Sequence, residues 1–264
     1  MIAVLCLLRH RDVLGRFRFL GVVLLCPLAI THADDVITEP LPKQSYVRLE
    51  PSYGFLGSGG RSSELHARGL LVYRGLFVPG LDPDRTVSGV VADLGILHES
   101  TSTLHATGLT DLELNYVSGI RLDDGAFGGG VAVLVPTATV SAFGNGTVGV
   151  GPACFGQLTA ISHLELSILA RSFFSVTGSS SRSTEFFTKL QPSAVVSLPD
   201  GYLLSSDGEI EIDWLAHSAT VPVNLEIAHL LGDHVLLQVG PEIEVAGRER
   251  GAVRVDVRID YLAP

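Results

Sequence analysis

Cysteine, methionine and tryptophan are scarce in this chain of 264 residues, which contains three Cys, one Met and one Trp. Two of the cysteines, Cys6 and Cys26, lie near the start, so Cys154 has no partner in the rest of the sequence. A disulfide framework is therefore excluded. Beyond residue 33 there is also no apolar run of about 20 residues, the length that a membrane-spanning helix needs. No long stretch has the apolar spacing of an amphipathic helix, so we expect few helices.

The first 33 residues have the features of a secretory signal peptide. Four arginines form a basic lead, Phe19 to Ile30 is mainly apolar, and Thr31-His32-Ala33 supplies small residues for a cleavage site. We therefore expect residues 1–33 to be a signal peptide that is cut before Asp34, and residues 34–264 to form one domain. A retained anchor helix is the alternative, although the apolar stretch is short for a membrane span.

Basic side chains are few outside this segment. It holds four of the 18 Lys and Arg but one of the 28 Asp and Glu, so residues 34–264 carry 14 basic against 27 acidic side chains. The basic residues are not clustered, which excludes a nucleic-acid partner. The nine His show no metal-ligand spacing, and no glycine-rich phosphate loop joins a strand to a helix. We expect neither a metal nor a cofactor.

Polar and apolar residues alternate in short segments, and the period of two predicts β-strands. The pattern is clearest in 253–261, where Val, Ile and Tyr alternate with Arg and Asp. Gly128-Gly129-Gly130 lies inside one segment, where we expect it to permit a close backbone approach. Together with turn residues such as Asp-Gly, the pattern predicts twelve strands. They lie near residues 44–54, 64–77, 86–98, 111–121, 127–136, 147–160, 163–175, 185–198, 202–214, 219–230, 234–246 and 252–261.

The strand pattern predicts an all-β fold, a closed antiparallel transmembrane β-barrel that follows the signal peptide. In hydrocarbon every backbone N–H and C=O must be paired within the protein, which leaves helices or closed barrels. Short turns such as 123–125 and 199–201 alternate with longer connections such as 99–110 and 137–146, as at the two ends of such barrels. We expect most aromatic residues to lie at membrane interfaces near strand ends. The alternative is a soluble β-sandwich. The aromatic residues in question include Tyr53, Phe155, Phe173, Trp214 and Tyr261.

Charged residues share one face of several predicted strands, and we expect them to line the lumen. Carboxylates two residues apart lie about 7 Å from each other on a strand, so the lining should favour cations. We expect Arg254 and Arg258 to pair with Glu242 and Glu244, and Lys189 with Glu209 or Glu211. A cation-tolerant pore and a salt-bridge network that plugs the lumen both remain open. The candidate lining residues are Asp111, Glu113, Lys189, Glu209, Glu211, Asp213, Glu242, Glu244, Arg254, Asp256, Arg258 and Asp260.

Several short motifs resemble a family of outer-membrane barrels named for the meta-pathway of phenol degradation and often labelled as transporters. They occur in family order over about residues 108–261, as Gly108–Leu114, Leu134–Ala138, Gly149–Pro152, Leu190–Pro192, Leu198–Ser206, Ile212–Trp214 and Val221-Pro222. The resemblance implies an outer-membrane location and passage of small molecules, including aromatic or hydrophobic compounds. It also implies contact with outer-membrane lipid and with the outer-membrane assembly machinery.

We therefore expect a channel for passive uptake of small molecules. The alternatives are a barrel with a plugged lumen in a structural role and a lipid-modifying barrel enzyme. For the enzyme, His98-Glu99-Ser100 offers an imidazole and a hydroxyl on one strand face. The Asn-Gly dipeptide expected after the serine of an outer-membrane phospholipase is missing here, and the surrounding residues are typical of a polar loop. We therefore expect no enzymatic activity.

Overall fold

A computed structural model describes residues 45–56, 60–74, 85–101, 104–178, 185–247 and 250–263. The chain divides into two compact units, residues 1–34 and 35–264. The first unit, and with it the expected signal peptide of residues 1–33, lies outside the described residues. Within the described ranges, no helix is both long and apolar enough to cross a membrane.

The described part of the second unit is one antiparallel sheet with a single short 3-10 turn, Pro199–Gly201. Its strands are β1 (Tyr46–Phe55), β2 (Arg61–Arg74), β3 (Thr86–Ser100), β4 (His105–Leu109), β5 (Leu112–Leu122), β6 (Gly125–Val135), β7 (Thr147–Ile161), β8 (Leu164–Gly178), β9 (Phe186–Ser197), β10 (Tyr202–Ser206), β11 (Ile210–Asp213), β12 (Ser218–Asn224), β13 (Glu226–Leu231), β14 (Val235–Ala246) and β15 (Val253–Leu262).

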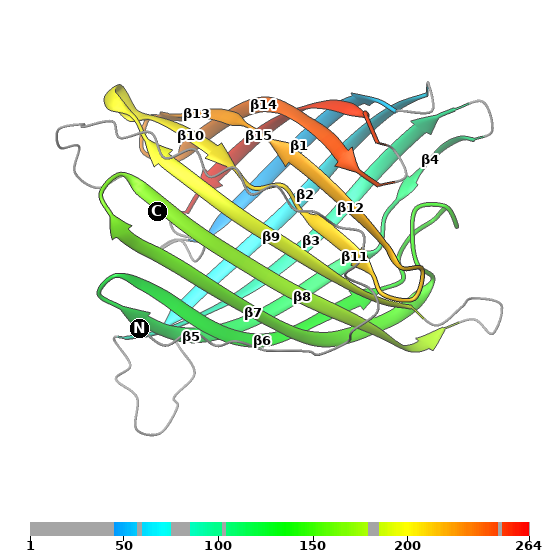
Figure 1. Cartoon of the computed structure of the whole chain (residues 1–264), viewed down its shortest axis with the longest axis horizontal. Helices are drawn as coiled ribbons and strands as arrows, with labels where there is room; N and C mark the ends of the chain where they lie inside the picture. Colours follow the sequence, from blue (N-terminus) through cyan, green and yellow to red (C-terminus); the bar gives the residue numbers. More distant parts are fainter. Residues whose placement is uncertain are drawn as a thin grey trace, which may run out of the picture. The chain divides into compact units, whose positions relative to one another are not determined.

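The sheet closes into a barrel because the first strand pairs with the last, with Tyr46 opposite Leu262 (Figure 1). Three pairs of consecutive strands each occupy one position in the barrel: β4 with β5 beside β3, β10 with β11 beside β9, and β12 with β13 beside β14. The described residues thus form twelve barrel positions. The predicted closed 12-stranded antiparallel barrel is confirmed, and each predicted segment overlaps one position.

The connection expected at residues 99–110 is partly wrong, because it contains strand β4. The pairing of Ser100 with His105 continues the hairpin of β3 beyond its pairing with β5, which ends at Asp93 and Glu113. The residues of β4 are His, Ala, Thr, Gly and Leu, a mixture in which apolar and polar residues do not alternate clearly. Periodicity therefore gave no strand signal there.

The two ends of the barrel differ in their connections. At the turn end, where β1 begins and β15 ends, strands are joined by residues 123–124, 162–163 and 232–234. The tight geometry requires left-handed backbone at His163 (φ 63°) and at Gly232 (φ 67°). At the loop end, residues 136–146 and 214–217 connect strands. The predicted alternation of short turns with longer connections is present in these described segments.

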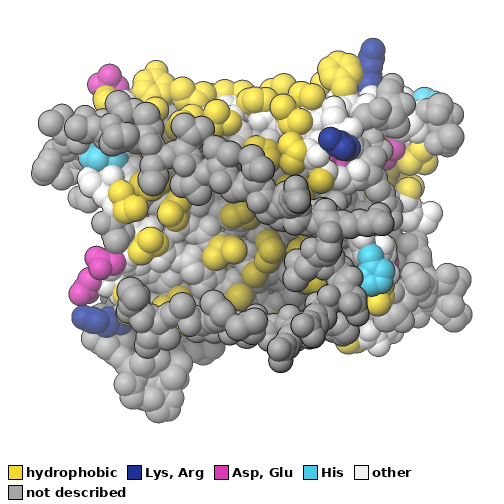
Figure 2. Space-filling model, viewed as in Figure 1, with side chains coloured by type: hydrophobic (Ala, Val, Ile, Leu, Met, Phe, Trp, Pro, Cys, Tyr) yellow, Lys and Arg dark blue, Asp and Glu magenta, His cyan; other side chains and the backbone are white. Residues whose placement is uncertain are grey.

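The outer surface of the barrel is apolar. On β15, the outward side chain of Val255 is 50% exposed, whereas the inward Asp256 is 4% exposed. Figure 2 shows hydrophobic side chains over the visible face, with most of the coloured charged side chains and His near its left and right ends. Phe174 and Phe186 stack at 4.4 Å near the loop end, and Trp214 stacks on Phe186. This surface suits lipid at its middle and a membrane interface at its rim.

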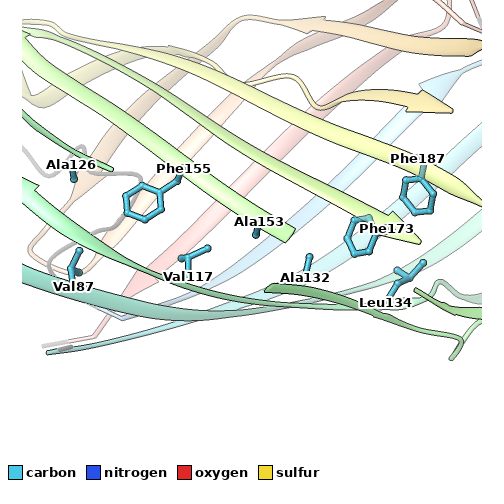
Figure 3. Close-up of a cluster of buried hydrophobic side chains, with 9 residues drawn as sticks. All are labelled: Val87, Val117, Ala126, Ala132, Leu134, Ala153, Phe155, Phe173 and Phe187. Carbon is cyan, nitrogen blue, oxygen red and sulfur yellow. The ribbon is translucent and has the colours of Figure 1, made fainter. Parts of the chain in front are cut away.

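One inner wall is also apolar. It lies on β3 and β5 to β9, where a cluster of buried side chains points into the barrel (Figure 3). The expectation that Phe155 and Phe173 lie at a membrane interface is wrong, because both belong to this inner cluster. A Cβ at Gly130 would overlap the Tyr116 carbonyl oxygen. The expected close backbone approach at the glycine run is therefore confirmed. The cluster consists of Val87, Val117, Ala126, Ala132, Leu134, Ala153, Phe155, Phe173 and Phe187.

Candidate functional site

The lumen contains two cavities of different character. The loop-end cavity has a volume of about 340 Å³ and is lined mainly by charged residues. The turn-end cavity has a volume of about 230 Å³, and its wall includes many aliphatic side chains, such as Leu70, Leu203 and Leu236. Inward positions of the same strands contribute to both, so the chemistry of the lumen changes along the barrel axis.

A belt of ion pairs separates the two cavities. Arg68, Gln191 and Asp207 belong to both cavity walls and therefore lie at the boundary. Next to them, the Arg171 guanidinium donates to Glu113 and to Glu209. Ion pairs of this kind, withdrawn from bulk water, persist because each partner satisfies the other.

Lys189 completes this group of charges. Its Nζ lies 3.1 Å from Glu113 Oε2 and 2.9 Å from Glu209 Oε1. Two cations thus share two carboxylates that come from β5 and from the segment between β10 and β11. We refer to Glu113, Arg171, Lys189 and Glu209 as the Arg171 cluster. It connects β5, β8 and β9 across the lumen.

Arg258 forms a second junction across the lumen. Its Nη1 lies 2.6 Å from Asp207 Oδ2 and 3.0 Å from Glu226 Oε2, and its Nε lies 3.1 Å from Glu50 Oε2. Because these carboxylates come from β1, from β13 and from the segment between β10 and β11, one arginine links several parts of the barrel wall.

Asp207 reaches this junction because the barrel wall is interrupted beside it. The β10–β13 ladder ends at Ser205 and Glu226, and the β11–β12 ladder begins at Glu211 and Thr220. Asn224 bridges the gap: its Oδ1 accepts the Asp207 backbone N–H at 2.7 Å, and its Nδ2 donates to Asp207 Oδ1 at 2.7 Å. Side-chain bonds thus replace part of the ladder and fix the Asp207 carboxylate.

Other ion pairs join direct neighbours in the sheet. Arg48 bonds to Asp260 through two contacts of 2.6 and 2.8 Å, and Arg68 Nε donates to Asp93 at 2.7 Å. In both pairs the two residues are register partners on adjacent strands. Cross-strand proximity therefore accounts for them without any feature of the lumen.

The structure places most of the candidate lining residues around the loop-end cavity. Asp260 contributes to the wall of the turn-end cavity instead. Asp213 and Glu244 are in neither cavity wall among the described residues. Those around the loop-end cavity are Asp111, Glu113, Lys189, Glu209, Glu211, Glu242, Arg254, Asp256 and Arg258.

Two of the candidate carboxylates hold connections at the loop end. Asp213 accepts the backbone N–H groups of Leu215 and Ala216 at 2.9 and 2.8 Å, and so caps the turn after β11. The Asp111 carboxylate accepts the N–H groups of Ala138 and Asn145 at 3.1 and 2.6 Å. Asp111 therefore fixes the connection 136–146 against the loop-end cavity, as well as lining it.

The expected ion pairs are partly confirmed. Arg254 lies 3.5 Å from Glu242, and Lys189 bonds to Glu209. Arg258 does not follow its expected pairing with neighbouring β14, because its side chain extends across the lumen to Asp207. An alternation pattern finds the inward face of a strand, but it contains no information on which far strand a long side chain reaches.

Sequence reasoning missed several residues of the belt. Arg48 shares an inward face with Glu50 and Ser52, opposite Val47 and Leu49, so alternation in 46–53 would have indicated it. Arg171 and Asp207 gave no comparable signal. Arg171 lies among small and apolar residues of β8, and Asp207 lies between two strands.

The histidine and serine considered for catalysis are not bonded to each other. His98 Nδ1 lies 2.7 Å from Thr107 Oγ1, and Ser100 Oγ lies 2.9 Å from His105 Nδ1. Both contacts join β3 to β4 directly across the hairpin. They are accounted for as cross-strand pairs that stabilise this exposed extension.

Solved structures share the barrel architecture of the chain. An outer membrane channel from Pseudomonas putida F1 superposes with a TM-score of 0.64 at 14% identity, covering 89% of this chain and all of that one. The NanC porin superposes with a TM-score of 0.54 at 10% identity, covering 81% of this chain and 98% of that one. No family model and no curated protein matches the sequence. The fold is that of outer-membrane β-barrels.

Proposed function

We propose that this chain is an outer-membrane channel that admits small molecules passively. In this proposal, residues 1–33 direct export and are removed, and residues 34–264 insert into the outer membrane with the help of the assembly machinery. The lumen carboxylates and arginines then select the solutes that pass. Outer-membrane lipid covers the apolar exterior.

The observation that carries the proposal is the distribution of side chains on β15, where apolar residues face outward and charged residues face inward, the reverse of a soluble protein. Val255 faces outward and is exposed, while Asp256 and Arg258 on the same strand are buried inside the barrel. A soluble protein would place the apolar face inside. Only a lipid surround makes the arrangement favourable, and the charged lumen with its two cavities then becomes the aqueous part.

The turn-end cavity supports a finer proposal about the solute. Val117, Phe155 and Leu203 belong to its wall together with further aliphatic side chains. Pockets lined in this way favour molecules with an apolar body. We propose that aromatic or hydrophobic compounds are among the solutes, consistent with the resemblance to the barrels named for phenol degradation.

Planar-bilayer recording tests the channel proposal. Purified full-length protein should show stable unitary conductance and a reversal potential that indicates cation preference. Replacing Glu209, Glu211 and Asp213 together by Gln should lower this preference. A folded barrel with heat-modifiable migration but no conductance would overturn the proposal. Amino-terminal sequencing of the membrane form should begin at Asp34.

The belt of ion pairs favours a second candidate, a barrel whose lumen is plugged. Arg171 and Arg258 each contact carboxylates from more than one segment of the barrel wall, and the two cavities meet at the polar side chains of Arg68, Gln191 and Asp207. A plugged barrel would give no conductance either as wild type or after the Arg171 cluster is broken. A channel whose belt rearranges would conduct in both forms.

A further inference from the structure

Asp256 is a carboxylate without a partner in the wall of the loop-end cavity. Its side chain is buried, and within the described ranges it makes no hydrogen bond and no ion pair. A carboxylate that is withdrawn from bulk water and has no donor carries a desolvation cost. It lowers that cost either by taking up a proton or by binding a cation.

The residues around Asp256 leave space for a ligand and make the position strongly negative. Its register partners are Ser52 on β1 and Gly240 on β14, both too small to fill the cavity beside it. Glu50 and Glu242 lie on the same two strands, two residues from these partners. No basic side chain directly opposes Asp256 in the sheet.

The nearby arginines do not balance this group of carboxylates. Arg258 is shared by Glu50, Asp207 and Glu226, and Arg254 pairs with Glu242. Five carboxylates, counting Asp256, therefore face two guanidinium groups. The excess negative charge favours a positively charged ligand.

A metal ion does not suit this arrangement. Among the described residues, no group of three or more His, Cys, Asp or Glu side chains could hold one. Calcium and magnesium need several oxygen ligands that converge within about 2.0–2.6 Å of one point. An ammonium group instead donates to separate acceptors at ordinary hydrogen-bond distance.

Three apolar side chains line the other side of the loop-end cavity, next to charged residues such as Glu113 and Lys189. Leu134 on β6, Phe187 on β9 and Phe143 of the connection 136–146 belong to its wall. In the strand order, β6 and β9 are separated from β15 by several strands on either side. The cavity thus has an acidic side around Asp256 and, away from it, a group of three apolar side chains, and aromatic faces also attract cations. Its volume of about 340 Å³ is sufficient for a small organic molecule.

We infer that the loop-end cavity binds an organic ammonium ion with an apolar body, whose charged head contacts Asp256 and whose body packs toward Leu134, Phe143 and Phe187. This inference deepens the proposed channel and rests on it only for the route by which the ligand enters. Binding can be measured on detergent-solubilised protein without conduction, so failure of one proposal is distinguishable from failure of the other.

Calorimetric titration with phenethylammonium chloride tests the inference on the full-length protein. Phenylacetate and 2-phenylethanol serve as ligand controls, because they have the same ring with a negative or neutral head. We expect saturable binding of the ammonium ion alone. Asp256→Asn should weaken it about tenfold or more, the size of a lost charge-assisted contact. Glu211→Gln removes a charge from the same cavity and should weaken binding less than about threefold.

A second variant keeps the test decisive if Asp256→Asn fails to fold. Ser52→Lys places a tethered ammonium group opposite Asp256 and should abolish binding of the free ligand while the barrel keeps its heat-modifiable migration. Equal binding of 2-phenylethanol would overturn the inference. So would unchanged affinity in both Asp256→Asn and Ser52→Lys, which would mean that the carboxylate holds only a proton.

Discussion

The two inner walls of the barrel differ in the side chains that they direct into the lumen. On β14, β15, β1 and β2, inward positions carry Glu, Asp and Arg, and ion pairs fill the space. On β6 and β7, inward positions carry mainly Ala, Gly, Leu and Phe, and the wall packs like the core of a soluble protein. A single sheet thus encloses half an ionic network and half a hydrophobic cluster.

Because of this difference, we expect the two walls to have separate roles: the apolar wall stabilises the closed barrel, and the charged wall determines which solutes it binds. The apolar wall allows close approach of neighbouring strands, because glycine replaces side chains at positions such as Gly130 and Gly151. On the charged wall, long side chains pair with one another and line the loop-end cavity. We therefore expect changes on the apolar wall to affect folding, and changes on the charged wall to affect solutes.

The largest expected effect comes from filling a glycine of the apolar wall. In Gly130→Val, the new side chain would overlap the Tyr116 carbonyl oxygen. Separating the strands should cost roughly 3 kcal/mol of folding free energy, at the upper end for overpacking. Urea titration of the barrel in detergent, followed by heat-modifiable migration, measures the loss.

Gly69→Val is the matched control for this change. A Cβ at Gly69 meets no atom within 4 Å, and valine favours a strand. Its stability should equal or exceed that of the wild type. If both variants lose the same stability, close approach of the strands does not explain the glycine at residue 130.

The next prediction concerns the outer surface of the barrel, which is apolar behind both the charged and the apolar inner wall. Val255→Arg places a charge on the lipid face and should cost about 2–4 kcal/mol if the position is deep in the membrane. Val253→Arg, on the same face at the first residue of β15, should cost about 0–1 kcal/mol because interfaces tolerate arginine. Unfolding titrations in lipid vesicles give both values. Equal costs at the two positions would contradict a lipid-facing assignment for Val255.

The charged wall was predictable from the sequence to the extent that its contacts are local. On β15, Arg254, Asp256 and Arg258 alternate with apolar residues, and the same strand supplied the clearest prediction. The Arg254 and Glu242 pair follows from register between neighbouring strands. Contacts across the lumen, such as Arg171 with Glu113, depend on how far the sheet curls, and no local pattern contains that information.

The apolar wall was harder to predict, although its strands were found. Strand β6 reads Gly-Ala-Phe-Gly-Gly-Gly-Val-Ala-Val-Leu-Val, in which both faces are apolar or small. Alternation therefore could not tell its inner from its outer face, and Phe155 on β7 was expected at an interface for the same reason. Interruptions hid other residues: Asp207 lies between β10 and β11, where no strand pattern exists.

A conductance measurement sharpens the contrast between the walls. Arg171→Gln removes the cation that joins Glu113 to Glu209, so the belt between the cavities should loosen and unitary conductance should rise severalfold. Lys189 still bonds to both carboxylates, which limits the loss of stability. Arg254→Gln is the control, since Arg254 lines only the loop-end cavity. A similar rise in both variants would show that the belt is not the barrier.

The smallest effect concerns two carboxylates on one strand. Glu211 lines the loop-end cavity, whereas Asp213 caps the turn that follows β11. Because permeating ions respond to charge along their path, Glu211→Gln should lower the ratio of potassium to chloride permeability measured from reversal potentials. Asp213→Asn should leave that ratio unchanged and instead destabilise the barrel by about 1 kcal/mol, the usual value of a hydrogen bond. Equal changes of selectivity in the two variants would mean that the rim, and not the cavity, determines which ions enter.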